Sequence, residues 1–306
     1  MAAPYQLIRP DVGFLGVPVE TELERLDADA VILGVPHGWP YPHPGATAGC
    51  AVAPTAIRAR AQRLARFRGH WDFDLDAPLP SLARVRDCGD VAGDATDGAG
   101  NSIRTESVVR AIAARGAVPI VLGGDDSVPI PVLRGLEARG PFTVLQVDAH
   151  LDFRDEVAGV REGYSSPMRR AAEMPHVDRI IHVGLRGVGS ARDADVADAR
   201  SAGNLLVTAR ELRERGAGYV LAELPADGSV FLSVDLDGLD PSVAPGVSAQ
   251  ALGGLSYEEA WELLGGIGSR LVGAAFTELV PDRDVNGLTA LLCVRLIVRL
   301  LTGLVS

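Results

Sequence analysis

The chain has 306 residues, 47% hydrophobic and 23% charged, so it can bury a full core and is not expected to be disordered. Its 29 basic and 40 acidic residues give a net charge of −11 without a basic run, which argues against binding to nucleic acid or an anionic membrane surface. No apolar stretch is long enough to span a bilayer, the N-terminus lacks a leader pattern, and the three scattered cysteines form no metal spacing or disulfide framework. We therefore expect a cytoplasmic protein with no membrane partner.

Strand-like runs alternate with helix-like runs, and no linker, repeat or composition break divides the chain. Apolar runs bounded by Gly or Pro predict buried parallel strands at Ala30–Val35, from Val85, and at Ala117–Leu122, Phe142–Val147, Arg179–Val183, Leu205–Thr208, Val230–Leu232 and Gly273–Leu279. Helical spacing and capping signals predict helices at Pro54–Phe67, Ser102–Ala114, Val128–Ala138, Arg192–Ala202, Arg210–Gly216, from Ser256, and at Asn286–Gly303. This alternation implies right-handed βαβ units with a mainly parallel sheet in a single α/β domain over residues 1–306.

Three acidic clusters directly follow predicted strands. They are Gly-Gly-Asp-Asp-Ser at 123–127, Asp-Ala-His-Leu-Asp at 148–152 and Ser-Val-Asp-Leu-Asp-Gly-Leu-Asp-Pro at 233–241. Residues two apart along an extended strand share a face, so Asp148, His150 and Asp152 can converge, as can Asp235 and Asp237. Carboxylates this close repel one another unless a cation joins them. The spacing therefore predicts a two-metal site at the carboxyl ends of the strands, where open α/β sheets bind ligands.

A simpler interpretation exists for part of this pattern. An aspartate just past a strand often caps the next helix. For Asp125, Asp126 or Asp240 taken alone, capping is the simpler explanation. Three capping residues at a period of two are unusual, however, and two such clusters in one chain favour metal binding.

These clusters, in this order and spacing, resemble those of the ureohydrolase family of arginases, agmatinases and related amidinohydrolases. The resemblance covers most of the chain and also includes Gly34-Val35-Pro36, Gly45-Ala46, Pro54-Thr55-Ala56-Ile57-Arg58, Asp87-x-Gly89-Asp90-Val91, Ala244-Pro245-Gly246, Gly253-Gly254-Leu255-Ser256 and Thr277-Glu278-Leu279-x-Pro281-x-x-Asp284. It implies a three-layer α/β/α sandwich around a mainly parallel sheet of about eight strands. The Pro-Gly-Ala-type N-terminal loop and the Arg-Arg-Ala after Pro167 favour the agmatinase-like branch.

The resemblance also implies a reaction: hydrolysis of a guanidino or amidino C–N bond in a small cationic substrate, usually with release of urea. Two divalent ions, Mn²⁺ in this family, would serve it, since hard carboxylate oxygens suit that metal. Asp148 and Asp235 would bridge the ions, with His150 and Asp237 completing one, and Asp126 and Asp152 the other. Asp152 is a candidate catalytic residue as well, and Glu278 matches the carboxylate that grips the guanidinium through paired hydrogen bonds.

The chain departs from the family pattern at three places. Most relatives carry His where Asp126 stands, which leaves one imidazole among five carboxylates here. Tyr164 occupies the position of a His that shuttles protons in many agmatinase-like members, and a phenol is a poorer shuttle at neutral pH. His37 or His43, in the first rim loop, could replace it. The rim segment 246–251 differs as well, so agmatine is not assumed to be the substrate.

Two alternative functions stay open. The changes at Asp126 and Tyr164 are compatible with a catalytically silent homologue that serves as a structural or regulatory subunit. A related hydrolase could instead cleave a non-guanidino C–N bond, such as a formimino or ureido bond, although Glu278 favours a cation with paired donors. The resemblance further implies a homo-oligomer, a trimer or a hexamer.

Overall fold

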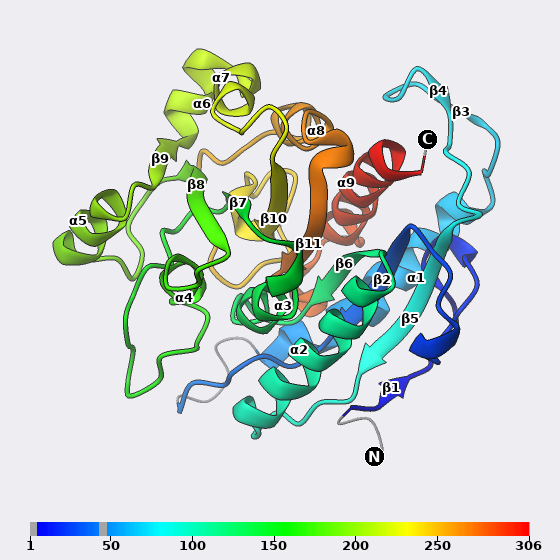
Figure 1. Cartoon of the computed structure of the whole chain (residues 1–306). Coiled ribbons are helices and arrows are strands. Elements are labelled where there is room, and N and C mark those ends of the chain that lie inside the picture. The colour runs from blue at the N-terminus through cyan, green and yellow to red at the C-terminus, as the bar shows by residue number, and fades with distance from the viewer. Residues whose placement is uncertain (1–4, 43–47, 306) are drawn as a thin grey trace.

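The computed structural model describes residues 5–42 and 48–305, which contain a nine-stranded sheet at the centre of the molecule (Figure 1). Its order is β1-β5-β2-β6-β11-β10-β7-β8-β9. Eight neighbouring strands run parallel: β5 (Val85–Val91), β2 (Ala30–Val35), β6 (Val118–Gly123), β11 (Leu271–Thr277), β10 (Ser229–Asp235), β7 (Phe142–Val147), β8 (Val177–Leu185) and β9 (Leu205–Thr208). This confirms the predicted α/β class and mainly parallel sheet.

Short additional strands escaped prediction because two residues carry no periodic signal. The edge strand β1 (Leu7–Ile8) pairs antiparallel with β5, and β3 (Trp71–Asp72) pairs with β4 (Ala77–Pro78) in a separate hairpin. The sheet therefore has one more strand than expected, at its edge.

Helices cover both faces of the sheet and complete the three layers (Figure 1). One face packs against α1 (Ala53–Ala65), α6 (Ala209–Arg215), α7 (Ala217–Ala222), α8 (Tyr257–Gly265) and α9 (Leu288–Leu304). The other packs against α2 (Gly98–Ala114), α3 (Pro129–Gly135), α4 (Pro167–Ala172) and α5 (Asp193–Ser201). Alternate strand residues enter the two cores: Ile32 belongs to the first, and its neighbours Val31 and Leu33 to the second. Burial on both faces explains why the strands read as continuous apolar runs.

Helix boundaries follow local capping. The helix α2 begins at Gly98, before the predicted Ser102, because the Asp97 side chain accepts a hydrogen bond from the Gly100 amide. The capping box of α8 is present, with Ser256 and Glu259 each accepting from the other's backbone N–H. Short 3₁₀ turns link these elements: η1 (Phe14–Gly16), η2 (Leu23–Arg25), η3 (Ala48–Val52), η4 (Glu137–Arg139), η5 (Leu236–Gly238), η6 (Gly268–Arg270) and η7 (Pro281–Arg283). Over residues 5–42 and 48–305, every helix is too short or too polar to cross a bilayer.

The strand order brings the acidic clusters to one place. The four central strands β6, β11, β10 and β7 are neighbours, and their carboxyl ends lead into the acidic segments. In the register of β7 and β10, Val147 pairs with Val234, so Asp148 and Asp235 are the next residues on adjacent strands. Asp235 in turn pairs with Thr277 at the end of β11. Segments more than a hundred residues apart in the sequence therefore meet at one edge of the sheet.

Candidate metal centre

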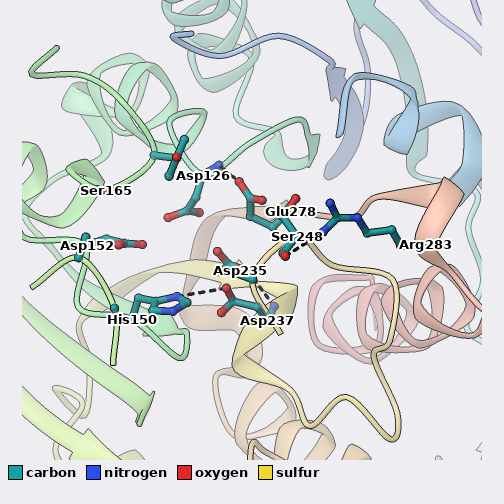
Figure 2. A pocket seen from close by; sticks show the side chains of 13 residues that line it. Asp126, His150, Asp152, Ser165, Asp235, Asp237, Ser248, Glu278 and Arg283 are labelled. Atoms are coloured by element: carbon teal, nitrogen blue, oxygen red, sulfur yellow. Dashed lines mark hydrogen bonds and ion pairs between the residues drawn. The ribbon is translucent and has the colours of Figure 1, made fainter. Parts of the chain in front are cut away.

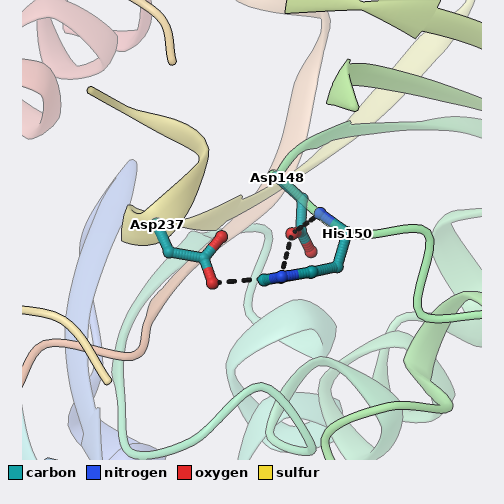
Figure 3. Close-up of side chains that lie close together, drawn as sticks. All are labelled: Asp148, His150 and Asp237. Atoms are coloured by element: carbon teal, nitrogen blue, oxygen red, sulfur yellow. Dashed lines mark hydrogen bonds and ion pairs between the residues drawn. The ribbon is translucent and has the colours of Figure 1, made fainter. Parts of the chain in front are cut away.

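Two groups of ligand atoms meet at this edge, and within each group the atoms lie within 4.8 Å of one another. In the part of the chain that the structure describes, the first contains Asp148, His150 and Asp237 (Figure 3), and the second contains Asp126, Asp148, Asp152 and Asp235. The structure thus brings together all six side chains predicted as ligands. Asp148 belongs to both groups, as expected for a shared ligand, whereas Asp235 belongs only to the second. Its Oδ1 accepts the Asp237 backbone N–H at 2.8 Å, which ties that oxygen to its own turn.

The imidazole of His150 lies between two carboxylates. Its Nδ1 is 3.1 Å from Asp237 Oδ2 and 3.5 Å from Asp148 Oδ1. Hydrogen bonds to these carboxylates, Asp148 first and Asp237 second, raise the pKa of His150 to about 10. The carboxylates are themselves held by backbone amides, since His150 N–H donates to Asp148 at 2.5 Å and Ala149 N–H to Asp237 at 3.2 Å. The His150 ring thus contacts both carboxylates of the first group.

The second group concentrates buried negative charge. Burial raises the pKa values of Asp126, Asp152 and Asp235 well above the ordinary range, and repulsion from Asp148 or Asp237 raises them further. Asp152 also has a left-handed backbone, with φ 45°, a strained conformation that is common at functional sites. One oxygen of Asp126, Oδ2, is buried with no hydrogen-bond partner. Oxygen donors that are clustered, buried and partly unpaired fit a hard divalent cation.

Helix capping explains none of the three candidates: Asp125 and Asp240 close local turns, and α3 and α8 have other N-cap residues, Val128 and Ser256. Asp125 accepts hydrogen bonds from the backbone N–H and the hydroxyl of Ser127, and Asp240 accepts backbone N–H groups of its own loop, including that of Ser242. Asp126 does not cap α3, whose first residues lack a side-chain cap. Its Oδ1 instead accepts the Thr277 hydroxyl at 2.6 Å, across the sheet in β11. The contacts of Asp126 therefore fit a place in the ligand cluster and not a helix cap.

A line of buried polar groups supports Asp148 from behind. Gln146 Nε2 donates to Asp148 Oδ2 at 2.6 Å, and Gln146 Oε1 lies 2.5 Å from His182 Nδ1. His182 Nε2 lies 3.2 Å from the Asn204 amide nitrogen. Burial lowers the pKa of His182 to about 4, so the ring is neutral, with one donor and one acceptor nitrogen. No sequence pattern indicated this network, because Gln146 and His182 lie inside strands rather than at their ends.

The carboxylates line the floor of a pocket of about 430 Å³ (Figure 2). Glu278 faces this pocket from the end of β11, with a left-handed φ of 65°. Its Oε1 accepts the Asp126 backbone N–H at 2.9 Å, and its Oε2 lies 3.7 Å from the Cys50 Sγ donor. Burial, and secondarily the charge of Asp125, raise the pKa of Glu278 to about 8. A desolvated carboxylate in this position is well placed to bind a cation.

The candidates for proton transfer lie in different places. Tyr164 lines the pocket, and its ring meets that of Tyr41 edge to face at a centroid distance of 4.5 Å. Burial raises the pKa of the Tyr164 phenol above its ordinary value. His37 lines a separate cavity of about 10 Å³, so its position gives its suggested role no geometrical support. His43 lies outside the described residues.

The pocket also contains residues that sequence patterns did not single out. Ser165, Ser190, Ser248 and Arg283 line it. Arg283 stands inside the Thr277–Asp284 motif, but at one of its variable positions. Its position in the motif that contains Glu278 is the sequence feature from which Arg283 could have been predicted as a pocket residue.

Comparison with known proteins decides the family. The sequence profile described as the arginase family matches residues 28–303. The chain belongs to the arginase family. It is 33% identical to mitochondrial agmatinase of Gallus gallus, over 94% of this chain and 84% of the relative. It is 32% identical to guanidinobutyrase of Pseudomonas aeruginosa, over 90% of this chain and 87% of the relative.

Solved structures agree with this assignment. Proclavaminate amidino hydrolase from Streptomyces clavuligerus superimposes with a TM-score of 0.85 at 27% identity, covering 97% of this chain and 98% of the other. Formiminoglutamase of Trypanosoma cruzi, solved with Mn²⁺, has a TM-score of 0.79 at 26% identity, covering 97% and 99%. The prediction of a hydrolase acting on amidino C–N bonds is therefore confirmed.

Proposed function

We propose that this family member hydrolyses the guanidino C–N bond of a small guanidino compound and releases urea, with two Mn²⁺ ions as cofactors. The observation that carries the proposal is the pair of ligand groups sharing Asp148, in a pocket that Glu278 also lines. The relatives named above include agmatinase and guanidinobutyrase, both of which act on guanidino compounds.

Asp148, His150 and Asp237 would hold one ion, and Asp126, Asp148, Asp152 and Asp235 the other. Bound in pairs, such ions make a water molecule acidic enough to supply the nucleophile near neutral pH. Asp152, a candidate catalytic residue as well as a ligand, has its carboxylate buried among the ligands of the second group. We therefore assign it a ligand role.

Glu278 would bind the guanidinium of the substrate. Its two oxygens are oriented by the Asp126 amide and the Cys50 thiol, and the carboxylate lines the same pocket as the ligands. A guanidinium beside Glu278 favours its charged form and lowers its raised pKa, so substrate binding and ionisation of Glu278 are coupled. Two parallel N–H···O bonds would then fix the reacting carbon above the ligand groups.

Tyr164 would act as a hydrogen-bond donor in this reaction. Because burial raises its pKa, the phenol keeps its proton at neutral pH. It can donate to a leaving amine or to a substrate oxygen, but it cannot serve as a base there. Tyr164 would orient groups, while proton removal depends on the ligand cluster.

Urea release from a panel of guanidino compounds, with Mn²⁺ supplied, tests the proposal. We expect urea from the wild-type protein and none from Asp237→Ala, with two Mn²⁺ ions per chain by elemental analysis of the wild type. Formamide or ammonia without urea would favour the formimino alternative. Two bound ions without product from any compound would favour the silent homologue.

We further propose one domain over residues 1–306 that assembles as a trimer or hexamer in the cytoplasm. The family resemblance supports the assembly. Light scattering of the purified protein measures its mass, and a monomer of 32.1 kDa would contradict it.

A further inference from the structure

Arg283 brings a positive charge into a pocket dominated by carboxylates. It ends the short turn η7, which follows Glu278 and β11. Among the thirteen described residues that line the pocket, it is the sole Arg or Lys, against the five acids Asp126, Asp152, Asp235, Asp237 and Glu278. Residues 43–47, which lie outside the described residues, include neither Arg nor Lys in their sequence.

The hydrogen-bonding capacity of Arg283 is only partly used. Its Nη1 donates to the Ser248 carbonyl at 2.9 Å and to the Val247 carbonyl at 3.5 Å. Within residues 5–42 and 48–305, no carboxylate oxygen lies within ion-pair distance of its guanidinium, and Nε and Nη2 donate no hydrogen bond. Figure 2 shows the guanidinium directed toward Ser248 and Glu278. The carbonyls position the side chain and leave one side of its planar fork open to a ligand.

Within the described chain, acidic partners that would neutralise Arg283 are absent, although many other arginines are paired. Arg154, close to the same pocket, donates to the Ser190 carbonyl and forms an ion pair with Asp195 at 3.3 Å. Arg295 is held by Asp72 and Asp74. An arginine without a carboxylate, at the rim of a substrate pocket, is suited to a carboxylate supplied by the ligand.

We propose that Arg283 binds a carboxylate at the far end of the substrate, so that the substrate class is the ω-guanidino acids. The inference rests on the proposed function. Glu278 would take the guanidinium and Arg283 the carboxylate, a pair of opposite charges that matches a zwitterion. A second cation at the tail would instead face Arg283 with like charge, which selects against it. The substrate would then be a zwitterion without net charge, and not the small cationic compound expected from the sequence.

A series of compounds with the same three-carbon chain on the guanidino nitrogen tests this. The series is γ-guanidinobutyrate with a carboxylate tail, n-propylguanidine with a neutral tail, and (aminopropyl)guanidine with an ammonium tail. We expect kcat/KM to be at least about tenfold higher for the acid than for the amine, as charge-assisted hydrogen bonds imply. The preference should weaken as ionic strength rises, because Arg283 is exposed at the rim.

Variants at Arg283 separate recognition from a structural role. Arg283→Ala should raise KM for the acid about tenfold, leave its kcat nearly unchanged, and leave the neutral compound unaffected. Arg283→Lys should restore part of the preference, and Arg283→Glu should reverse it toward the amine. Arg270→Ala is the matched control, since Arg270 ends the 3₁₀ turn η6 and also donates only to backbone carbonyls in the described chain.

Each outcome supports or overturns the inference. If Arg283→Ala lowers kcat/KM equally for all three compounds, or if the wild type prefers the ammonium tail, the carboxylate subsite is wrong while the proposed function stands. If no guanidino compound yields urea, the proposed function and this inference fall together. If Arg283→Ala loses activity selectively towards the acid, and Arg270→Ala behaves as the wild type, both are supported.

Discussion

Gln146 Nε2 donates a hydrogen bond of 2.6 Å to Oδ2 of Asp148, the carboxylate shared by both ligand groups. The direction of this bond follows from the residues behind it. Asn204 donates to the neutral His182 ring, so the opposite ring nitrogen carries the proton and donates to Gln146 Oε1. Each donor thus points toward Asp148, and the network orients that side chain without touching a metal position.

Gln146→Leu should therefore weaken metal binding. It removes the donor to Asp148 and leaves the His182 N–H unpaired in the core. We expect Mn²⁺ affinity to fall about tenfold to a hundredfold by calorimetry, as for other residues that orient metal ligands. The free energy of unfolding, measured with chelator present, should decrease by about 1–3 kcal/mol. Thr143→Val, a buried change on the same strand β7, is the control, and unchanged Mn²⁺ affinity in Gln146→Leu would contradict the orienting role.

The ligand residues themselves should be needed for metal binding but not for folding. Asp148→Asn or Asp237→Ala should abolish hydrolysis and reduce bound Mn²⁺ below two per chain. With chelator present, the melting temperature should change little, because each change removes one of several repelling charges but also a hydrogen-bond partner of His150. Asp240→Asn, which alters an aspartate outside the ligand groups, should keep activity and metal. Collapse of the chelated Asp237→Ala protein would indicate a structural role instead.

The metal-free protein should become less stable as pH rises. A carboxyl whose folded-state pKa exceeds its unfolded value binds its proton more tightly when folded, so its stabilisation is present at low pH and lost as pH passes the folded pKa. The ordinary values for Asp237 and Glu278 are 3.8 and 4.5, and the folded ones are about 6 and about 8. The melting temperature measured with chelator should therefore fall as the pH rises from about 4 to about 8. Added Mn²⁺ should raise the melting temperature more at about pH 8 than at about pH 4. A melting temperature of the chelated protein that does not change with pH would contradict the clustering of buried carboxylates.

Asp126→His tests the unusual ligand of the second group. The change replaces a carboxylate by the imidazole that the family resemblance implies at this position, and lowers the negative charge of the group by one. Imidazole suits Ni²⁺ and Zn²⁺ better than carboxylate does, so affinity for these ions should rise relative to Mn²⁺ in competition titrations. Asp125→Asn, next to it but outside the ligand groups, serves as the comparison. The ligand assignment is withdrawn if the metal preference does not move.

Tyr164 and His37 should differ in their effect on turnover. Tyr164→Phe removes a hydroxyl from the pocket and should lower kcat for urea release with little change in stability. His37→Gln alters a side chain in a separate cavity and should leave kcat unchanged. Steady-state kinetics of the two variants with one substrate decides this. A larger loss in His37→Gln than in Tyr164→Phe would reverse the assignment.

Local sequence was sufficient to locate the ligand candidates. The apolar runs predicted at Phe142–Val147 and Val230–Leu232 lie in β7 and β10, and the acidic clusters follow them. Burial on both faces makes such strands recognisable, and the period of two places alternate side chains together. Five of the six ligand candidates and the α/β class were therefore predictable from residue types and their spacing. Asp126 became a candidate only through the family resemblance.

Only the tertiary structure decided how these parts meet. The order of the strands depends on how the helices pack against the two faces of the sheet. These are contacts between residues far apart in the sequence, and no local pattern predicts them. The strand order places β8 beside β7, so that His182, 36 residues from Gln146 in the sequence, supports Asp148 through it. It also directs Arg283 into the pocket and His37 into another cavity, although both belong to loops that sequence patterns alone could not orient. Side-chain direction in loops is set by tertiary packing, and there the sequence by itself determined residue type but not position.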